Sequence, residues 1–281
     1  MSAFLETLAH EAFLQHALAA GLLAAFGCGV VGTYVVAKRI SFMAGGVAHS
    51  VLGGMGIAHF LGASPLAGAL AAALVAALAI GWVSLHAGQH EDTIIAALWA
   101  VGMAIGVLFI SRTPGYNADL MSYLFGNILM VSRADLYGMA ALDAAVILVA
   151  MLFSKQFLAV SFDPEFARVR GVRVDVFHVL LLCLVALTVV VLIQVVGMIL
   201  VLALLTLPAA IASQYRSRLL PIMAVATGLG AAFTCGGLAL SYAPDLPAGA
   251  TIILVAGASY LVSLALRALL ARRRSARAAA R

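Results

Sequence analysis

The chain has 281 residues, of which 65% are apolar and only 10% are charged. Soluble domains average roughly 45–50% apolar and about 25% charged residues, so this composition excludes a soluble or disordered protein and requires a lipid environment. The net charge of +5 does not indicate a nucleic-acid binder, because six of the sixteen basic residues lie within the last fifteen positions.

Missing motifs exclude further classes of function. The three cysteines, Cys28, Cys183 and Cys235, all lie in apolar segments, which excludes a disulfide scaffold. The two lysines, Lys38 and Lys155, are followed by Arg and Gln, so the chain has no GxxxxGK[ST] phosphate loop. If ATP drives this protein, another chain binds it. No spacing of Ser, His and Asp indicates a catalytic triad, which argues against an intramembrane enzyme.

Nine apolar segments are long enough to be transmembrane helices, which need about 20 mostly apolar residues. The predicted spans are closely spaced and form a single domain over residues 1–281. They lie at 15–37, 41–61, 65–86, 92–111, 134–153, 174–195, 197–213, 219–240 and 249–270. The sixth and seventh spans nearly abut at Val195–Gly197, so they are either a helix pair with a tight turn or one broken helix.

The basic residues predict the orientation by the positive-inside rule. With the N-terminus outside, only Arg112 and Arg133 lie in outer segments. The inner segments hold Lys38, Arg39, Lys155, Arg168, Arg170, Arg173, Arg216, Arg218 and the six arginines from Arg267 onward. Residues 1–14 then form an outer segment without Lys or Arg, which is not the start of a signal peptide. Residues 271–281 form a basic cytoplasmic tail that meets anionic lipid headgroups.

The second span contains the most informative polar residue. Gly45, His49, Gly53 and Gly56 follow i, i+4, i+8 and i+11 and share one helical face. One interpretation is a metal pathway, because polar groups inside a membrane are expensive and neutral imidazole is a metal ligand. The other is a packing seam of small residues, in which His49 bonds a neighbouring carbonyl. His59 lies near the outer end of this span and is a second candidate ligand.

Three later segments carry further candidates. Residues 117–131 are apolar but too short to cross the membrane, and they indicate a short re-entrant outer helix. Asp143 is the one carboxylate deep in a span; it either lies on the pathway or bonds a neighbouring helix. Pro208 predicts a break or kink in the middle of the seventh span, and broken helices often line transport routes.

Residues 162–171 predict a short, charged helix on the inner side. Asp163 is a suitable cap, Pro164 suits the first turn, Glu165 favours the N-terminal end, and Gly171 ends the helix.

Six segments in order now carry a resemblance to a family. They are KRISFMAGGVAHSVLGGMGIA (38–58), EDTIIAALWAVGMAIGVLFIS (91–111), DLMSYLFGNIL (119–129), DPEFARVRGV (163–172), VVGMILVLALLTLPAAIA (195–212) and LPAGATIILVAG (246–257). Over about residues 25–265 the chain resembles the membrane permeases of bacterial zinc, manganese and iron ABC importers (the ZnuB/MntB/TroC type).

The resemblance implies a fold, a set of partners and a coupling site. The fold is an all-α polytopic membrane protein of eight to nine transmembrane helices with a cytoplasmic coupling helix. The partners are a second copy of the chain, two cytoplasmic ATP-binding subunits and an extracytoplasmic metal-binding protein. The coupling helix falls on 162–171, with Asp163, Glu165, Ala167 and Gly171 at the matching positions.

The resemblance also indicates the metal site and one departure from it. The family often has Asp and His four residues apart in the second span; His49 matches the His, whereas Gly45 replaces the Asp. Without that hard oxygen ligand, we expect zinc as cargo first, and manganese or iron next. No tightly bound cofactor is expected, and ATP is bound by the partner subunit.

The sequence therefore predicts a transport subunit of the bacterial inner membrane, with its N-terminus outside and its C-terminus in the cytoplasm. The alternative is a secondary transporter driven by an ion gradient, with Asp143 as the proton relay. A structural subunit that transports nothing is a further alternative.

Overall fold

The computed structural model describes residues 7–86, 90–113, 126, 128–242 and 244–279, and no strand occurs in these ranges. Within them, nine helices are long and apolar enough to cross a membrane. Their bounds are α2 Ala12–Ala37, α3 Ser41–Phe60, α4 Pro65–His86, α5 Glu91–Arg112, α7 Arg133–Leu152, α10 Val174–Val196, α11 Met198–Tyr215, α12 Leu219–Tyr242 and α13 Ala248–Ala279. This confirms the predicted all-α polytopic fold, with most span boundaries displaced by only a few residues.

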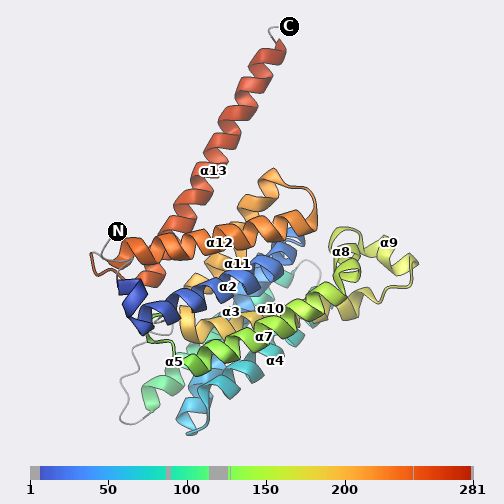
Figure 1. Ribbon diagram of the computed structural model, residues 1–281. Coiled ribbons are helices and arrows are strands. Elements are labelled where there is room, and N and C mark those ends of the chain that lie inside the picture. Colours follow the sequence, from blue (N-terminus) through green and yellow to red (C-terminus); the bar gives the residue numbers. More distant parts are fainter. Residues whose placement is uncertain (1–6, 87–89, 114–125, 127, 243, 280–281) are drawn as a thin grey trace.

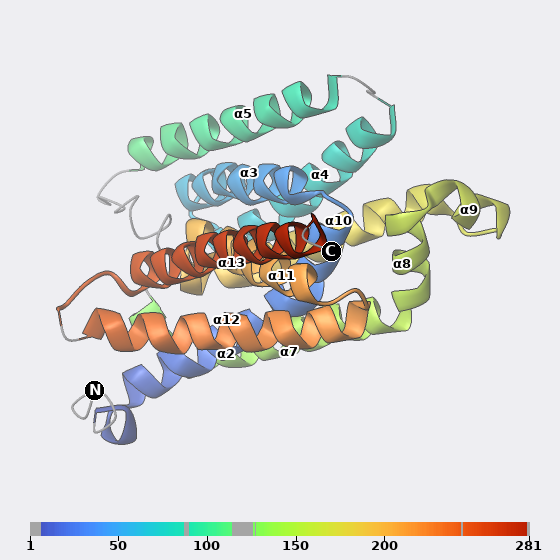
Figure 2. The same ribbon diagram turned by 90° about the horizontal axis from the view of Figure 1, so that it is seen from above.

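Helix α2 lies at the centre of the bundle and packs against α7, α10, α11 and α12. Helix α3 packs between α4 and α5, and α5 is largely exposed. Figure 2 shows α5 at one edge of the bundle and α12 and α7 at the opposite edge. The exposed surface of the bundle therefore includes most of α5 and the outer faces of α7, α12 and α13.

Close helix contacts depend on glycine. A Cβ atom on Gly32 of α2 would overlap the carbonyl oxygen of Leu205 in α11, so only glycine permits this approach. Gly54 of α3 makes a comparable backbone contact with Gly68 of α4. Small residues are the usual means of helix association in membranes, because lipid offers no hydrophobic driving force between helices.

Two short helices, α8 (Ser154–Phe162) and α9 (Pro164–Val169), follow α7 and project from the end of the bundle where α2 ends and α12 begins (Figure 1). The outer helix predicted at 117–131 lies mostly outside the described residues. Of that segment the structure describes Gly126, Val131 and the 3-10 turn η2 at Ile128–Met130. Ser132 then caps α7 through a reciprocal pair of hydrogen bonds with Asp135, which sets the start of α7.

The sixth and seventh spans are two helices joined at one residue. Gly197 separates α10 from α11 with φ +81° and ψ +157°, a backbone region that is essentially restricted to glycine. Gly126 packs directly against the backbone of Val196 and Gly197 at this corner. The sequence alternatives of a tight turn and a broken helix are thus resolved in favour of the turn.

We expect Gly197→Ala to lower the free energy of unfolding by about 1–3 kcal/mol, because a Cβ atom is strained at this φ and ψ. The measurement is denaturant unfolding of the purified chain in detergent. Gly138→Ala in α7 is the control, since its Cβ would have open space and alanine favours a helix. Equal stability of the Gly197→Ala chain and the natural chain would contradict the assigned backbone strain.

Candidate metal pathway along helix α3

The four predicted pathway residues of α3 have two different environments. Ideal Cβ atoms on Gly53 and Gly56 would lie 2.8 Å and 2.6 Å from the carbonyl oxygens of Gly102 and Gly106 in α5. This end of the predicted face is therefore a packing seam between α3 and α5. The seam joins the two helices backbone to backbone, which leaves no free surface at these glycines.

His49 lies on the same side of α3, where its ring stacks on Trp99 of α5. The ring centroids are 4.1 Å apart and the planes differ by 7°. Trp99 is itself held, because its indole Nε1–H donates to the Met103 sulfur at 3.1 Å. The His49 ring is half-buried, and its Nδ1 has no hydrogen-bond partner among the described residues. An oriented imidazole with an unused nitrogen is well suited to accept a metal ion.

Gly45 lies one turn before His49 and leaves space beside it. An ideal Cβ at Gly45 would have no side chain or neighbouring helix within 4 Å. The space at the Cβ position of Gly45 is therefore not filled by a side chain of the described residues.

The other two predicted ligands lie elsewhere. His59 is half-buried in the last turn of α3, about 15 Å along the helix axis from His49 at 1.5 Å per residue. Asp143 is 3% exposed in α7 and packs against Gly27 of α2; its Oδ2 has no hydrogen-bond partner in the described part of the chain. Within that part no three His, Cys, Asp or Glu residues gather as a metal cluster. The structure thus assembles no joint site from these residues.

The sequence predicts a break or a kink at Pro208, and the structure shows no break there. Helix α11 continues from Met198 to Tyr215 with Pro208 inside it, and the turn that separates α11 from α10 lies eleven residues earlier at Gly197. Proline removes one backbone hydrogen bond, but neighbouring helices and hydroxyl side chains compensate for this within membranes. Here Pro208 is buried inside α11, among the helices that pack around it.

The short inner helix predicted at 162–171 is present as α9. The Asp163 side chain accepts a hydrogen bond from the Phe166 N–H at 2.9 Å, and Pro164 occupies the first position. Gly171 has φ +81° and ends the segment. An exposed ion pair between Arg168 and Asp175, at 2.8 Å, joins α9 to the start of α10.

The faces of α9 differ in a way that sequence reasoning missed. Ala167 is buried against Val160 and Val174, so it attaches α9 to the rest of the chain. Glu165 is exposed, and the outward apolar side chains are Phe166, 52% exposed, and Val169, 87% exposed. A six-residue helix has too few positions for a hydrophobic period to indicate which side faces the protein.

The inner end of the α2–α3 connection is positively charged. Lys38 follows the last residue of α2 and is half-buried, and this burial lowers the pKa of its ammonium to about 8. At neutral pH most Lys38 side chains remain protonated. Together with the exposed Arg39, Lys38 gives the connection between α2 and α3 a positive charge.

Comparison with known proteins places this geometry in a family. Residues 10–267 match the ABC 3 transport family. An uncharacterized membrane protein of Synechocystis sp. is 49% identical over 267 residues, which are 95% of this chain and 95% of that protein. The manganese transport system membrane protein MntC of Halalkalibacterium halodurans is 35% identical over 260 residues, covering 92% of this chain and 89% of MntC.

A solved structure shares the fold. PsaBC from Streptococcus pneumoniae, in complex with Fab, aligns with a TM-score of 0.85 at 32% identity, over 93% of this chain and 94% of that one. Sequence and structure thus agree over nearly the whole length. The protein belongs to the ABC 3 transport family and is a membrane transport subunit rather than an enzyme.

Proposed function

We propose that this chain is the transmembrane permease of an ATP-driven importer of divalent transition metal ions in the bacterial plasma membrane. The observation that carries the proposal is His49: a half-buried imidazole inside a span, oriented by Trp99 and with one nitrogen unused by the described residues. Polar groups at this depth are costly and mark transport pathways. The names of relatives such as MntC support a metal as the cargo.

Two observations bear on which metal is carried. An imidazole without a carboxylate partner favours zinc, because manganese prefers hard oxygen ligands. The names of MntC and of the manganese import permease ScaB of Streptococcus gordonii favour manganese. We place zinc first on ligand chemistry and manganese second, and competition between the two ions in an uptake assay separates them.

The proposed partners follow from two features of this chain: it has no phosphate loop, and α9 has an exposed apolar face. Since the sequence has no phosphate loop, ATP is bound by separate cytoplasmic subunits. Helix α9 is their docking site, with Phe166 and Val169 as the apolar contacts and Glu165 beside them. A second copy of the chain and an extracytoplasmic metal-binding protein complete the importer. The N-terminus faces outside and the C-terminus faces the cytoplasm.

In the proposed mechanism, the binding protein releases the ion at the outer end of α3. His49 accepts it briefly, and the stacked Trp99 holds the ring in place while it does so. ATP binding then draws together the α9 helices of the two copies. Helices α3 and α5 move as one unit, because Gly53 and Gly56 tie their backbones together. Asp143 and His59 contribute to the pathway at separate levels.

We expect Gly45→Asp to shift cargo preference toward manganese. A Cβ atom at Gly45 meets no neighbour within 4 Å, and Gly45 lies one helical turn from His49, so an aspartate there would offer a hard oxygen ligand beside the imidazole. The measurement is the ratio of manganese to zinc uptake, with Gly45→Asn as the matched variant of similar size without the charge. If both variants leave the ratio of manganese to zinc uptake unchanged, Gly45 does not lie on the metal pathway.

The proposed function is tested by uptake into vesicles that contain the purified chain with its ATP-binding subunits. We expect zinc or manganese uptake with ATP inside the cytoplasmic compartment, and none when the ATP-binding subunits are omitted. Uptake driven by a proton or sodium gradient without these subunits would overturn the proposal and support a secondary transporter.

A further inference from the structure

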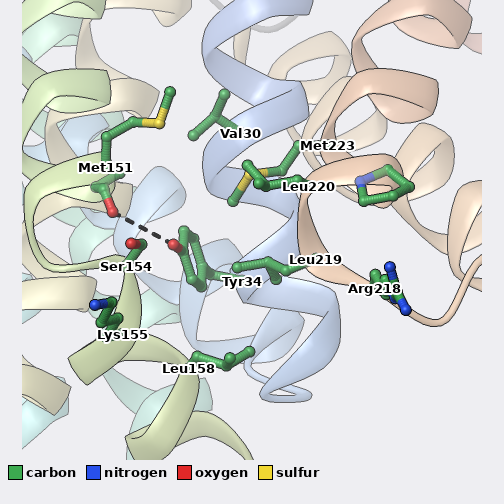
Figure 3. A pocket seen from close by; sticks show the side chains of 12 residues that line it. Val30, Tyr34, Met151, Ser154, Lys155, Leu158, Arg218, Leu219, Leu220 and Met223 are labelled. Atoms are coloured by element: carbon green, nitrogen blue, oxygen red, sulfur yellow. Dashed lines mark hydrogen bonds between the residues drawn. The ribbon is translucent and has the colours of Figure 1, made fainter.

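A cavity of about 640 Å³ lies away from α3, between α2, the end of α7, α8 and the start of α12 (Figure 3). Its volume is within the range of about 300–1,000 Å³ that small-molecule sites occupy. The lining residues are Val30, Tyr34, Ala150, Met151, Ser154, Lys155, Leu158, Arg218, Leu219, Leu220, Pro221 and Met223. None of them belongs to the proposed metal pathway or to α9.

The interior of the cavity is apolar. Val30, Met151 and Met223 line one end of it in Figure 3. Tyr34 contributes the phenol ring, whose hydroxyl already donates to the Ala150 carbonyl at 3.3 Å. The interior therefore suits a hydrocarbon group, which needs no hydrogen-bond partner.

The mouth of the cavity carries two cations. Lys155 lies three residues after the end of α7, and Arg218 lies one residue before the start of α12, so both lie at the inner ends of their spans. Figure 3 shows them on opposite sides of the cavity. Both are exposed, and neither makes an ion pair or hydrogen bond with another residue of the described chain. Their charge is available to an external anion.

The surroundings indicate that the mouth opens to lipid. Met151 is 57% exposed and Leu220 is 66% exposed, and both line the cavity from helices long and apolar enough to span the membrane. Large apolar side chains at the end of a span face acyl chains when nothing else covers them. Basic residues at this level attract the anionic headgroups of the inner leaflet.

We propose that this cavity binds one anionic phospholipid of the inner leaflet. One acyl chain lies against Val30, Met151 and Met223, and the headgroup phosphate lies between Lys155 and Arg218. Helices α7 and α12 each pack against α2, so the lipid would connect them across the surface of α2. Because α7 leads through α8 into α9, the bound lipid steadies the segment that carries the proposed ATPase contact.

The test is native mass spectrometry of the full-length chain purified in mild detergent, with phosphatidylglycerol or phosphatidylcholine added. We expect the natural chain to retain one phosphatidylglycerol selectively. Lys155→Gln with Arg218→Gln should weaken this binding about 30-fold. Each basic residue near a membrane surface strengthens the binding of an anionic lipid by a factor of about five to six, and the two factors multiply. Arg170→Gln with Arg173→Gln removes the same charge from exposed positions elsewhere and should leave binding unchanged.

Three further arms separate other occupants. Val30→Phe fills the apolar end and should reduce phosphatidylglycerol binding while both cations remain. Inorganic phosphate at millimolar concentration should not displace the lipid, because it lacks the acyl chain. Equal retention of phosphatidylcholine, or full binding of phosphatidylglycerol by the Lys155/Arg218 double variant, would overturn the proposal. The retained lipid would then be an adventitious additive only. A change from dimer to monomer on Val30→Phe would also overturn it, by assigning the cavity to a second copy. The assay requires no transport, so its failure leaves the proposed function untouched.

Discussion

Replacing His49 with alanine is expected to reduce metal uptake to the level of cells that lack the chain. The change removes the imidazole whose Nδ1 no described residue uses and leaves Trp99 without its stacking partner. Losing even an indirect support of a metal ligand costs roughly 10–100-fold in affinity, so the ligand itself should cost at least as much. The measurement is uptake of zinc and manganese in cells starved of both.

The structure offers a matched control for this variant. His86 also stacks on a tryptophan, Trp82, with ring centroids 5.1 Å apart, but it lies exposed at the inner end of α4. We expect His86→Ala to preserve uptake. If His49→Ala transports normally while the chain remains necessary for uptake, the family assignment stands and His49 leaves the mechanism. If no metal depends on the chain, the assigned cargo is wrong.

Placing a charge on the exposed face of α9 is expected to abolish uptake for a different reason, the loss of contact with the ATP-binding subunit. Val169 is 87% exposed, so Val169→Asp should not alter folding of the chain. Once an ATP-binding subunit covers this face, the carboxylate would be buried without a partner, at a cost of roughly 2–5 kcal/mol. We expect the ATP-binding subunit to be lost on copurification, together with ATP-dependent uptake.

Ser217→Asp is the control for this prediction. Ser217 is exposed at the same end of the bundle as α9, in the connection between α11 and α12 (Figure 1), so the variant adds the same charge away from α9. We expect normal copurification and uptake from it. Retention of the ATP-binding subunit by Val169→Asp would show that the docking surface lies elsewhere on the inner side.

Much of the fold follows from local chemistry, and the sequence was sufficient for it. Nine apolar segments predicted the spans, and the Asp163, Pro164 and Gly171 pattern predicted a capped helix that the structure contains as α9. Pro208 shows where local rules were insufficient. Its effect on α11 depends on compensation by surrounding helices, and the helix continues through it.

The site was predicted in outline only. Helical spacing predicted that Gly45, His49, Gly53 and Gly56 share one side of α3, but it could not indicate which neighbour covers each residue. The same spacing was compatible with both interpretations of these glycines, a metal pathway and a packing seam. The structure assigns Gly53 and Gly56 to the seam with α5 and leaves Gly45 open.

What the sequence determined by itself is therefore the membrane environment and the number of candidate spans, because these depend on composition along the chain. The orientation inferred from the basic residues stays a prediction. Tertiary structure alone decided that Trp99 holds His49, that Asp143 packs against α2, and that Val169 rather than Ala167 faces outward. The physical reason is that helical periodicity specifies which residues share a face, whereas contact between faces depends on how helices distant in sequence pack together.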